Sequence, residues 1–329
     1  MWYCSHRIDL QKEYDMDLKK LVKNPVVEIR KMQLRSRYAD DFVEQIESGH
    51  AVPLGNCADT YTVIIPEKVQ YHQPVILVGG FSQGIQAYAD EIHDLHTAGY
   101  VTIYTNPVKG YTGLPSAVHG QFQGVYTVPD IVLRKVLAID AILCQLDAQT
   151  YHLVGHSQGG MLATHVAALH ADKVATLTLV SPEGFQKDQA PFLIASKFAY
   201  QAADQMVDIV GQVIRGDTQL LEPSGRAGRT FMRNFFQQPL WRLTDEVPEG
   251  IQVDLAGLLR YLKESPVQVT FVTAHKDQLF TVGEYREYLE RDYGTGGGDV
   301  FALIDSWVSF ARKGAGHTAL GIEQPGILK

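Results

Sequence analysis

The sequence predicts an α/β fold with a mostly parallel central sheet, helices on both faces and an inserted helical cap. From about residue 59, short apolar runs alternate with longer helical stretches, which is typical of parallel β–α–β units. The apolar runs are nearly continuous, which indicates strands buried on both faces. Strands are predicted at 61–65, 75–78, 100–104, 151–154, 174–180, 267–273 and 300–304, and helices at 84–98, 129–147, 158–170 and 282–291.

The alternation of strands and helices is absent from two segments, which divides the chain into an extension, a core and a cap. Residues 1–50 are rich in charge and predict an N-terminal helical extension. Residues 183–265 are mainly helical, and an insertion of that size between core strands predicts a cap over one end of the sheet. The α/β core then comprises residues 51–182 and 266–329.

Composition restricts the function classes. The formal net charge of −8 argues against nucleic acid as a partner, because phosphate binding needs a basic surface. No apolar run is long enough for a membrane span, and no signal peptide is visible at the N-terminus. The three scattered cysteines fit reduced thiols, so we expect a cytoplasmic protein, with its oligomeric state left open.

The pattern G-x-S-x-G occurs twice, at Gly80–Gly84 and at Gly155–Gly159. In a nucleophile elbow, such a serine occupies a sharp strand-to-helix turn that requires very small neighbours. Three predicted strands precede the strand that leads to Ser157, whereas only one precedes the strand that leads to Ser82, and an elbow belongs near the middle of the sheet. We therefore expect Ser157 to be the nucleophile, supported by Gly155 and Gly159.

The first copy of the pattern then suits another role. A glycine loop after an early strand can direct a backbone N–H at a reacting carbonyl, and the residue after the nucleophile supplies the second N–H of such an oxyanion hole. The expected donors are the amides of Phe81 and Gln158, with Gly80 leaving room for the substrate.

A serine nucleophile needs a base and an acid that orients the base. His317 follows the last predicted strand on a glycine loop, and Asp277 follows the strand at 267–273. We expect His317 to be the base and Asp277 the acid, with Glu183 as the competing acid. His275 is interpreted as structural.

No cofactor or metal is expected. The pairs His93/His96 and His152/His156 lack the H-E-x-x-H pattern of zinc hydrolases, and we interpret them as surface or hydrogen-bonded histidines. The glycine-rich run at 294–298 does not follow a strand and predicts a connector.

Together these residues resemble the serine α/β-hydrolases over residues 59–329. The resemblance rests on Val78-Gly79-Gly80-Phe81, Gly155-His156-Ser157-Gln158-Gly159-Gly160, the Asp277 loop and Gly314-Ala315-Gly316-His317. The family commonly has His-Gly where this chain has Gly79-Gly80, so a polar brace behind the oxyanion loop is expected to be missing. The loop that begins at Asn106 also lacks the frequent Asp-Arg-Gly pattern.

The resemblance implies hydrolysis of a small-molecule carboxylic ester through an acyl-enzyme, and the apolar cap favours an apolar acyl or aromatic substrate. A thioesterase or acyltransferase with the same triad, and a non-catalytic binding protein of the same fold, are the alternatives.

Overall fold

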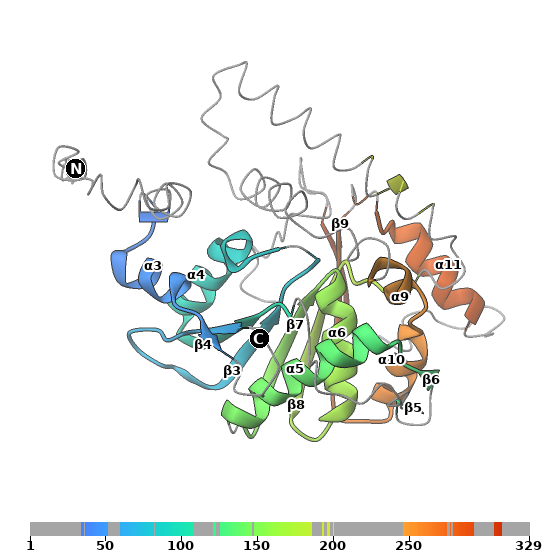
Figure 1. The fold of residues 1–329 in the computed structure, drawn as a ribbon, viewed down its shortest axis with the longest axis horizontal. Coiled ribbons are helices and arrows are strands. Elements are labelled where there is room, and N and C mark those ends of the chain that lie inside the picture. The colour runs from blue at the N-terminus through green and yellow to red at the C-terminus, as the bar shows by residue number, and fades with distance from the viewer. Residues whose placement is uncertain are drawn as a thin grey trace, which may run out of the picture.

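A computed structural model describes residues 34–35, 37–51, 60–81, 83–107, 121–122, 126–146, 148–185, 193, 196–197, 200, 246–274, 277, 279–292 and 306–310. Within these residues, eight strands form one sheet (Figure 1). Across the sheet they are β1 (His50–Ala51), β2 (Thr60–Ile64), β4 (Tyr100–Thr105), β3 (Tyr71–Val78), β7 (Tyr151–His156), β8 (Val174–Val180), β9 (Gln268–Ala274) and β10 (Ser306–Phe310). The strands from β4 to β10 are parallel, and β1 and β2 are antiparallel to their neighbours, which confirms the mostly parallel sheet.

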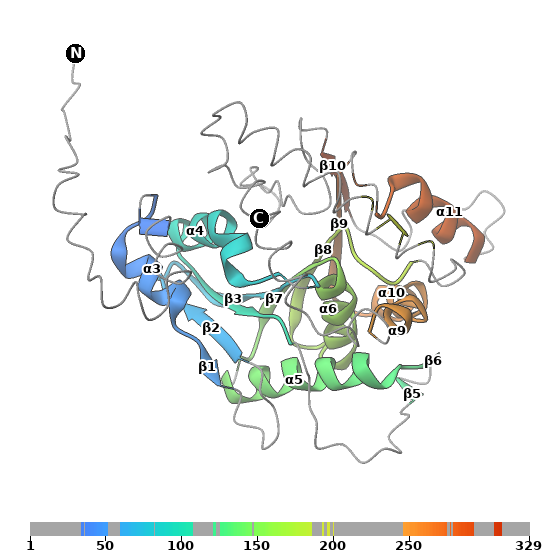
Figure 2. The same ribbon diagram turned by 45° about the horizontal axis from the view of Figure 1, so that its top comes forward.

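Helices cover both faces of this sheet (Figures 1 and 2). One face carries α3 (Asp40–Glu47), the short 3-10 helix η1 (Ile85–Tyr88) and α4 (Ala89–Ala98). The other carries α5 (Asp130–Leu146), α6 (Gln158–Leu169), α10 (Leu255–Lys263) and α11 (Val282–Asp292). The short helix α9 (Val247–Ile251) lies beside α5, and β5 (Gln121–Phe122) and β6 (Tyr126–Thr127) form a separate hairpin.

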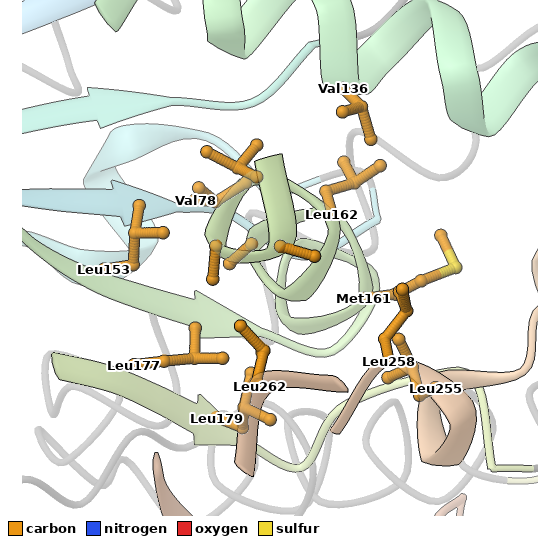
Figure 3. Packing of buried hydrophobic residues seen from close by; sticks show 14 of the residues in the cluster. Val78, Val136, Leu153, Met161, Leu162, Leu177, Leu179, Leu255, Leu258 and Leu262 are labelled. Carbon is orange, nitrogen blue, oxygen red and sulfur yellow. The ribbon is translucent and has the colours of Figure 1, made fainter. Parts of the chain in front are cut away.

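The strands are apolar along their length because both faces are buried. In β3, Ile76 and Val78 pack into the cluster beneath α5 and α6, while Val75 and Leu77 pack against α4 on the opposite face. Figure 3 shows the first cluster, where strand side chains such as Leu153 meet the side chains of α6 and α10. This packing fixes the start of α6 directly above the end of β7.

The last described strand was not among the predicted ones. β10 spans Ser306–Phe310 and pairs with β9 in parallel, whereas the strand predicted at 300–304 lies outside the described residues. Among the described strands β10 is the edge of the sheet. Its sequence, Ser-Trp-Val-Ser-Phe, has serines on both sides of a two-residue apolar run, and a search for longer continuous apolar runs misses such a strand.

Parts of the predicted extension and cap contact the core directly. Helix α3 buries Phe42, Val43 and Ile46 next to β2, and α10 packs on α6. Residues 1–33 and 201–245 lie outside the described residues. The division into an extension, a core and a cap therefore stays a prediction.

Candidate active site

Ser157 occupies a sharp turn between β7 and α6. Its backbone has φ 54° and ψ −121°, and positive φ is uncommon and strained for a residue with a side chain. The turn is bound to the neighbouring strand, because the N–H of Ser157 donates to the carbonyl of Val180 at 2.9 Å and its carbonyl accepts from the N–H of Glu183 at 3.0 Å. Ser157 is thereby fixed at the carboxyl end of the sheet.

The glycines around Ser157 allow this turn by close backbone approach. A Cβ on Gly155 would lie 2.4 Å from the carbonyl oxygen of Gly159, and a Cβ on Gly159 would lie 2.1 Å from that of Val78. Any side chain at these positions would therefore push α6 away from β3 and β7.

Gly159→Ala is expected to lower the free energy of unfolding by about 3 kcal/mol or more, because its methyl group would overlap backbone atoms of β3 that cannot rotate away. Gly283→Ala is the matched control, since its Cβ would meet only the Thr281 hydroxyl, at 3.9 Å. Alanine suits a helix better than glycine, so this variant should be at least as stable as the wild type. Urea unfolding measures both, and equal stability of Gly159→Ala and the wild type would contradict the close packing.

The loop after β3 lies against this turn. A Cβ on Gly80 would be 3.2 Å from the Cβ of Ser157, and Phe81 is buried next in the chain. Gln158, the first residue of α6, is buried as well. The structure thus brings Gly80 into direct proximity with Ser157, while Ser82 lies outside the described residues.

The expectation that this loop lacks a polar brace is wrong. The N–H of Gly80 donates to the phenol oxygen of Tyr88 at 2.8 Å, and the Asn106 amide donates to the carbonyl of Gly80 at 2.8 Å. The same amide donates to the carbonyl of Gln83 at 2.6 Å, and Tyr88 contacts Nδ1 of His156 at 3.0 Å. Side chains from η1 and from the loop after β4 therefore brace the loop, although nothing in its own sequence indicates them.

Tyr88 acts in this brace as a neutral phenol. Burial raises the pKa of its hydroxyl well above the ordinary value, and the neighbouring Tyr104 raises it further. The hydroxyl can accept from Gly80 and donate at the same time, since a phenol offers both functions.

Asp277 lies three residues beyond β9 and is buried. Its Oδ1 accepts hydrogen bonds from the N–H groups of Leu279 and Phe280, both at 2.9 Å, so the carboxyl group is held by its own loop. The strand order β7-β8-β9 places this loop two strands from Ser157, at the same edge of the sheet. His317 and His275 lie outside the described residues.

Glu183 follows β8 and faces α9. One of its carboxyl oxygens lies 2.3 Å from the position of a Cβ on Gly250. Burial, and secondly the nearby Glu246, raise the pKa of Glu183 to about 8, although Lys135 opposes the shift. At neutral pH the Glu183 carboxyl is therefore mostly protonated.

This proton makes stability depend on pH. The folded protein holds it up to about pH 8, whereas the unfolded chain releases it near pH 4.5. The folded state thus binds more protons between these values, so the free energy of unfolding falls as the pH rises, by up to about 1.4 kcal/mol per pH unit.

Glu183→Gln should remove this contribution, and the stability of the variant relative to the wild type should rise between pH 5 and pH 8. Urea unfolding of both proteins at pH 5, 6.5 and 8 measures the difference. A difference independent of pH would contradict the buried, protonated state.

The sequence around both glycine patterns matches a known protein family. A family model described as the alpha/beta hydrolase fold matches residues 74–227, which include both glycine patterns and Ser157. The chain has the α/β-hydrolase fold. A search of curated proteins finds no match.

Solved structures agree with this fold. A structure from a study of carboxylesterases of Nitrososphaera gargenis is 13% identical, with a TM-score of 0.51 over 82% of this chain and 91% of that one. A membrane phospholipase A described as a bacterial virulence factor is 15% identical, with a TM-score of 0.54 over 92% and 89%. The 2-hydroxy-6-oxo-6-phenylhexa-2,4-dienoate hydrolase of Rhodococcus sp. strain RHA1 is 13% identical, with a TM-score of 0.52 over 82% and 92%. At these identities the likeness concerns the fold.

Three histidines of the predicted pairs have structural neighbours. His93 and His96 contact the ring of Phe42, and His152 hydrogen-bonds Thr176 at 2.8 Å. Within the described ranges, no group of three or more His, Cys, Asp or Glu side chains could hold a metal ion. The described helices include none that is long and apolar enough to cross a membrane.

Proposed function

We propose that this protein is a serine hydrolase that cleaves carboxylic esters through an acyl-enzyme. The observation that carries the proposal is the strained backbone of Ser157 at the turn between β7 and α6, with the Gly80 loop beside its Cβ. A positive φ at a serine persists only where surrounding structure enforces it, and such strain is concentrated at functional sites.

The chemistry assigns one role to each group. His317 removes the proton from the Ser157 hydroxyl, whose oxygen attacks the acyl carbon. The N–H groups of Phe81 and Gln158 stabilise the negative charge on the former carbonyl oxygen. The imidazolium then protonates the leaving alcohol, and His317 next activates a water molecule that releases the acid and regenerates Ser157.

Asp277 fits the acid role better than Glu183. An acid in this role must be ionised to stabilise the imidazolium. Asp277 accepts two backbone hydrogen bonds, which favour a carboxylate, whereas Glu183 is protonated at neutral pH and faces α9. Neighbouring strands lie about 4.8 Å apart, so the ends of β7 and β9 are separated by roughly 10 Å. The side chains of Ser157 and Asp277 shorten that gap, so an imidazole that hydrogen-bonds to both can bridge it.

The acyl group of the substrate is proposed to be apolar or aromatic, because the sequence of residues 191–215, within the predicted cap, predicts a helix with one apolar face. Two of the similar structures carry names of ester-cleaving enzymes, a carboxylesterase and a phospholipase A. Ester cleavage is thus one of the activities named for proteins of this fold.

A panel of 4-nitrophenyl esters with acyl chains of two to twelve carbons tests the proposal, with EDTA added to one series. We expect hydrolysis that is insensitive to EDTA and faster for the longer chains. Matched thioesters, and added alcohol acceptors, report the thioesterase and acyltransferase alternatives. A protein that cleaves no ester and is not labelled by a fluorophosphonate would support the binding-protein alternative and contradict the proposal.

A further inference from the structure

A buried ion pair lies behind the start of α6. Lys135 of α5 pairs with Glu246, and both side chains are at most 2% exposed. The Lys135 ammonium also donates to Oε1 of Gln158 at 3.0 Å. Lys135 thus connects the first residue of α6 to the segment that precedes α9.

That segment is attached to α5 at a second point. The N–H of Ile131, in the first turn of α5, donates to a carboxyl oxygen of Glu249 at 2.9 Å. A carboxylate at a helix N-terminus is favourable because the N–H groups there lack helical partners. Residues 246–251 are therefore anchored on α5 at both Ile131 and Lys135.

Gln158 links the Lys135–Glu246 pair to the nucleophile turn. Its side chain is held by Lys135 on the buried side, while its backbone follows directly from the strained Ser157. We propose that the Lys135–Glu246 pair is a positioning device that fixes Gln158 and so aims its N–H at the reacting carbonyl. This inference rests on the proposed function.

Stability alone does not account for the pair. Taking two charges out of water is costly, and well-packed apolar residues commonly replace a buried ion pair without loss of stability. An ion pair that also donates to Gln158 gives an orientation that apolar side chains cannot provide. Removing both charges together should therefore separate the positioning role from a structural one.

The test uses Lys135→Met combined with Glu246→Met, so that no unpaired charge stays buried. Arg134→Met is the matched control, because Arg134 pairs with Asp130 on the more exposed side of the same helix. With the best ester, the double variant should lose roughly tenfold in kcat, less than the loss from deleting an oxyanion donor, while KM changes less than twofold. Arg134→Met should keep wild-type kcat.

A cycle with Gln158→Met tests the coupling. If Lys135 acts through Gln158, adding Gln158→Met to the double variant should cause little further loss of kcat. If the loss in the triple variant instead equals the product of the losses from Gln158→Met and from the double variant, the inference is overturned. Wild-type kcat in the stably folded double variant would also overturn it.

A measurement without substrate keeps this inference separate from the proposed function. In protein labelled with ¹⁵N-glutamine, the Gln158 backbone amide signal is assigned by its loss in Gln158→Met. It should broaden or split in the double variant and stay sharp in Arg134→Met. An unchanged signal overturns the positioning role even if no ester is cleaved, whereas an inactive wild-type protein overturns only the proposed function.

Discussion

Ser157→Ala is expected to lower kcat/KM for the best ester by about 10⁴- to 10⁶-fold, because no other hydroxyl occupies the strained turn. The fold should be retained, since the alanine keeps the backbone hydrogen bonds to Val180 and Glu183. Initial rates of ester hydrolysis and the urea unfolding midpoint measure the two effects separately.

Ser82→Ala provides the control, because Ser82 belongs to the other copy of the same pattern. It should keep most of the wild-type activity, as its proposed contribution to the site is limited to backbone near Phe81. If Ser82→Ala is inactive while Ser157→Ala hydrolyses the ester normally, the nucleophile has been assigned to the wrong copy.

Asp277→Asn is expected to lower kcat by about 10⁴-fold with a modest change in KM, because an amide cannot stabilise the imidazolium or select its tautomer. The loop can keep its shape, since the side-chain oxygen of asparagine can still accept from Leu279 and Phe280. Steady-state kinetics of the purified variant measure the loss.

Glu183→Gln is the matched comparison, because it makes the same change in the competing acid. Glu183 already holds a proton at neutral pH, so the variant should keep activity within about threefold of the wild type at pH 7. An active Asp277→Asn together with an inactive Glu183→Gln would transfer the acid role to Glu183.

Local sequence patterns were enough to predict the inner strands of the sheet and the shape of the turn, but not the edge strands β1 and β10. The apolar runs that form β3, β7 and β8 are continuous because each strand is buried on both faces. A strand buried on both faces lacks alternating polar residues, so it can be recognised from the sequence. The glycines near Ser157 were equally informative, since Gly155 and Gly159 stand where the backbone leaves no room for a side chain.

Contacts between distant residues could not be predicted in this way. Tyr88 and Asn106 brace the Gly80 loop from other elements, and Lys135 meets Glu246 across 111 positions of sequence. None of these side chains belongs to a local motif that would predict its partner. Its role depends on which elements the fold places side by side, and that information is not contained in spacing or periodicity.

The identity of Ser157 as the nucleophile can be tested by mapping a covalent adduct. The wild-type protein is treated with a fluorophosphonate, digested and analysed by mass spectrometry. We predict a single adduct on the peptide that contains Ser157, formed in the wild type and in Ser82→Ala and absent from Ser157→Ala. An adduct on Ser82 or on any other residue, or no adduct in a protein that hydrolyses esters, would contradict this account.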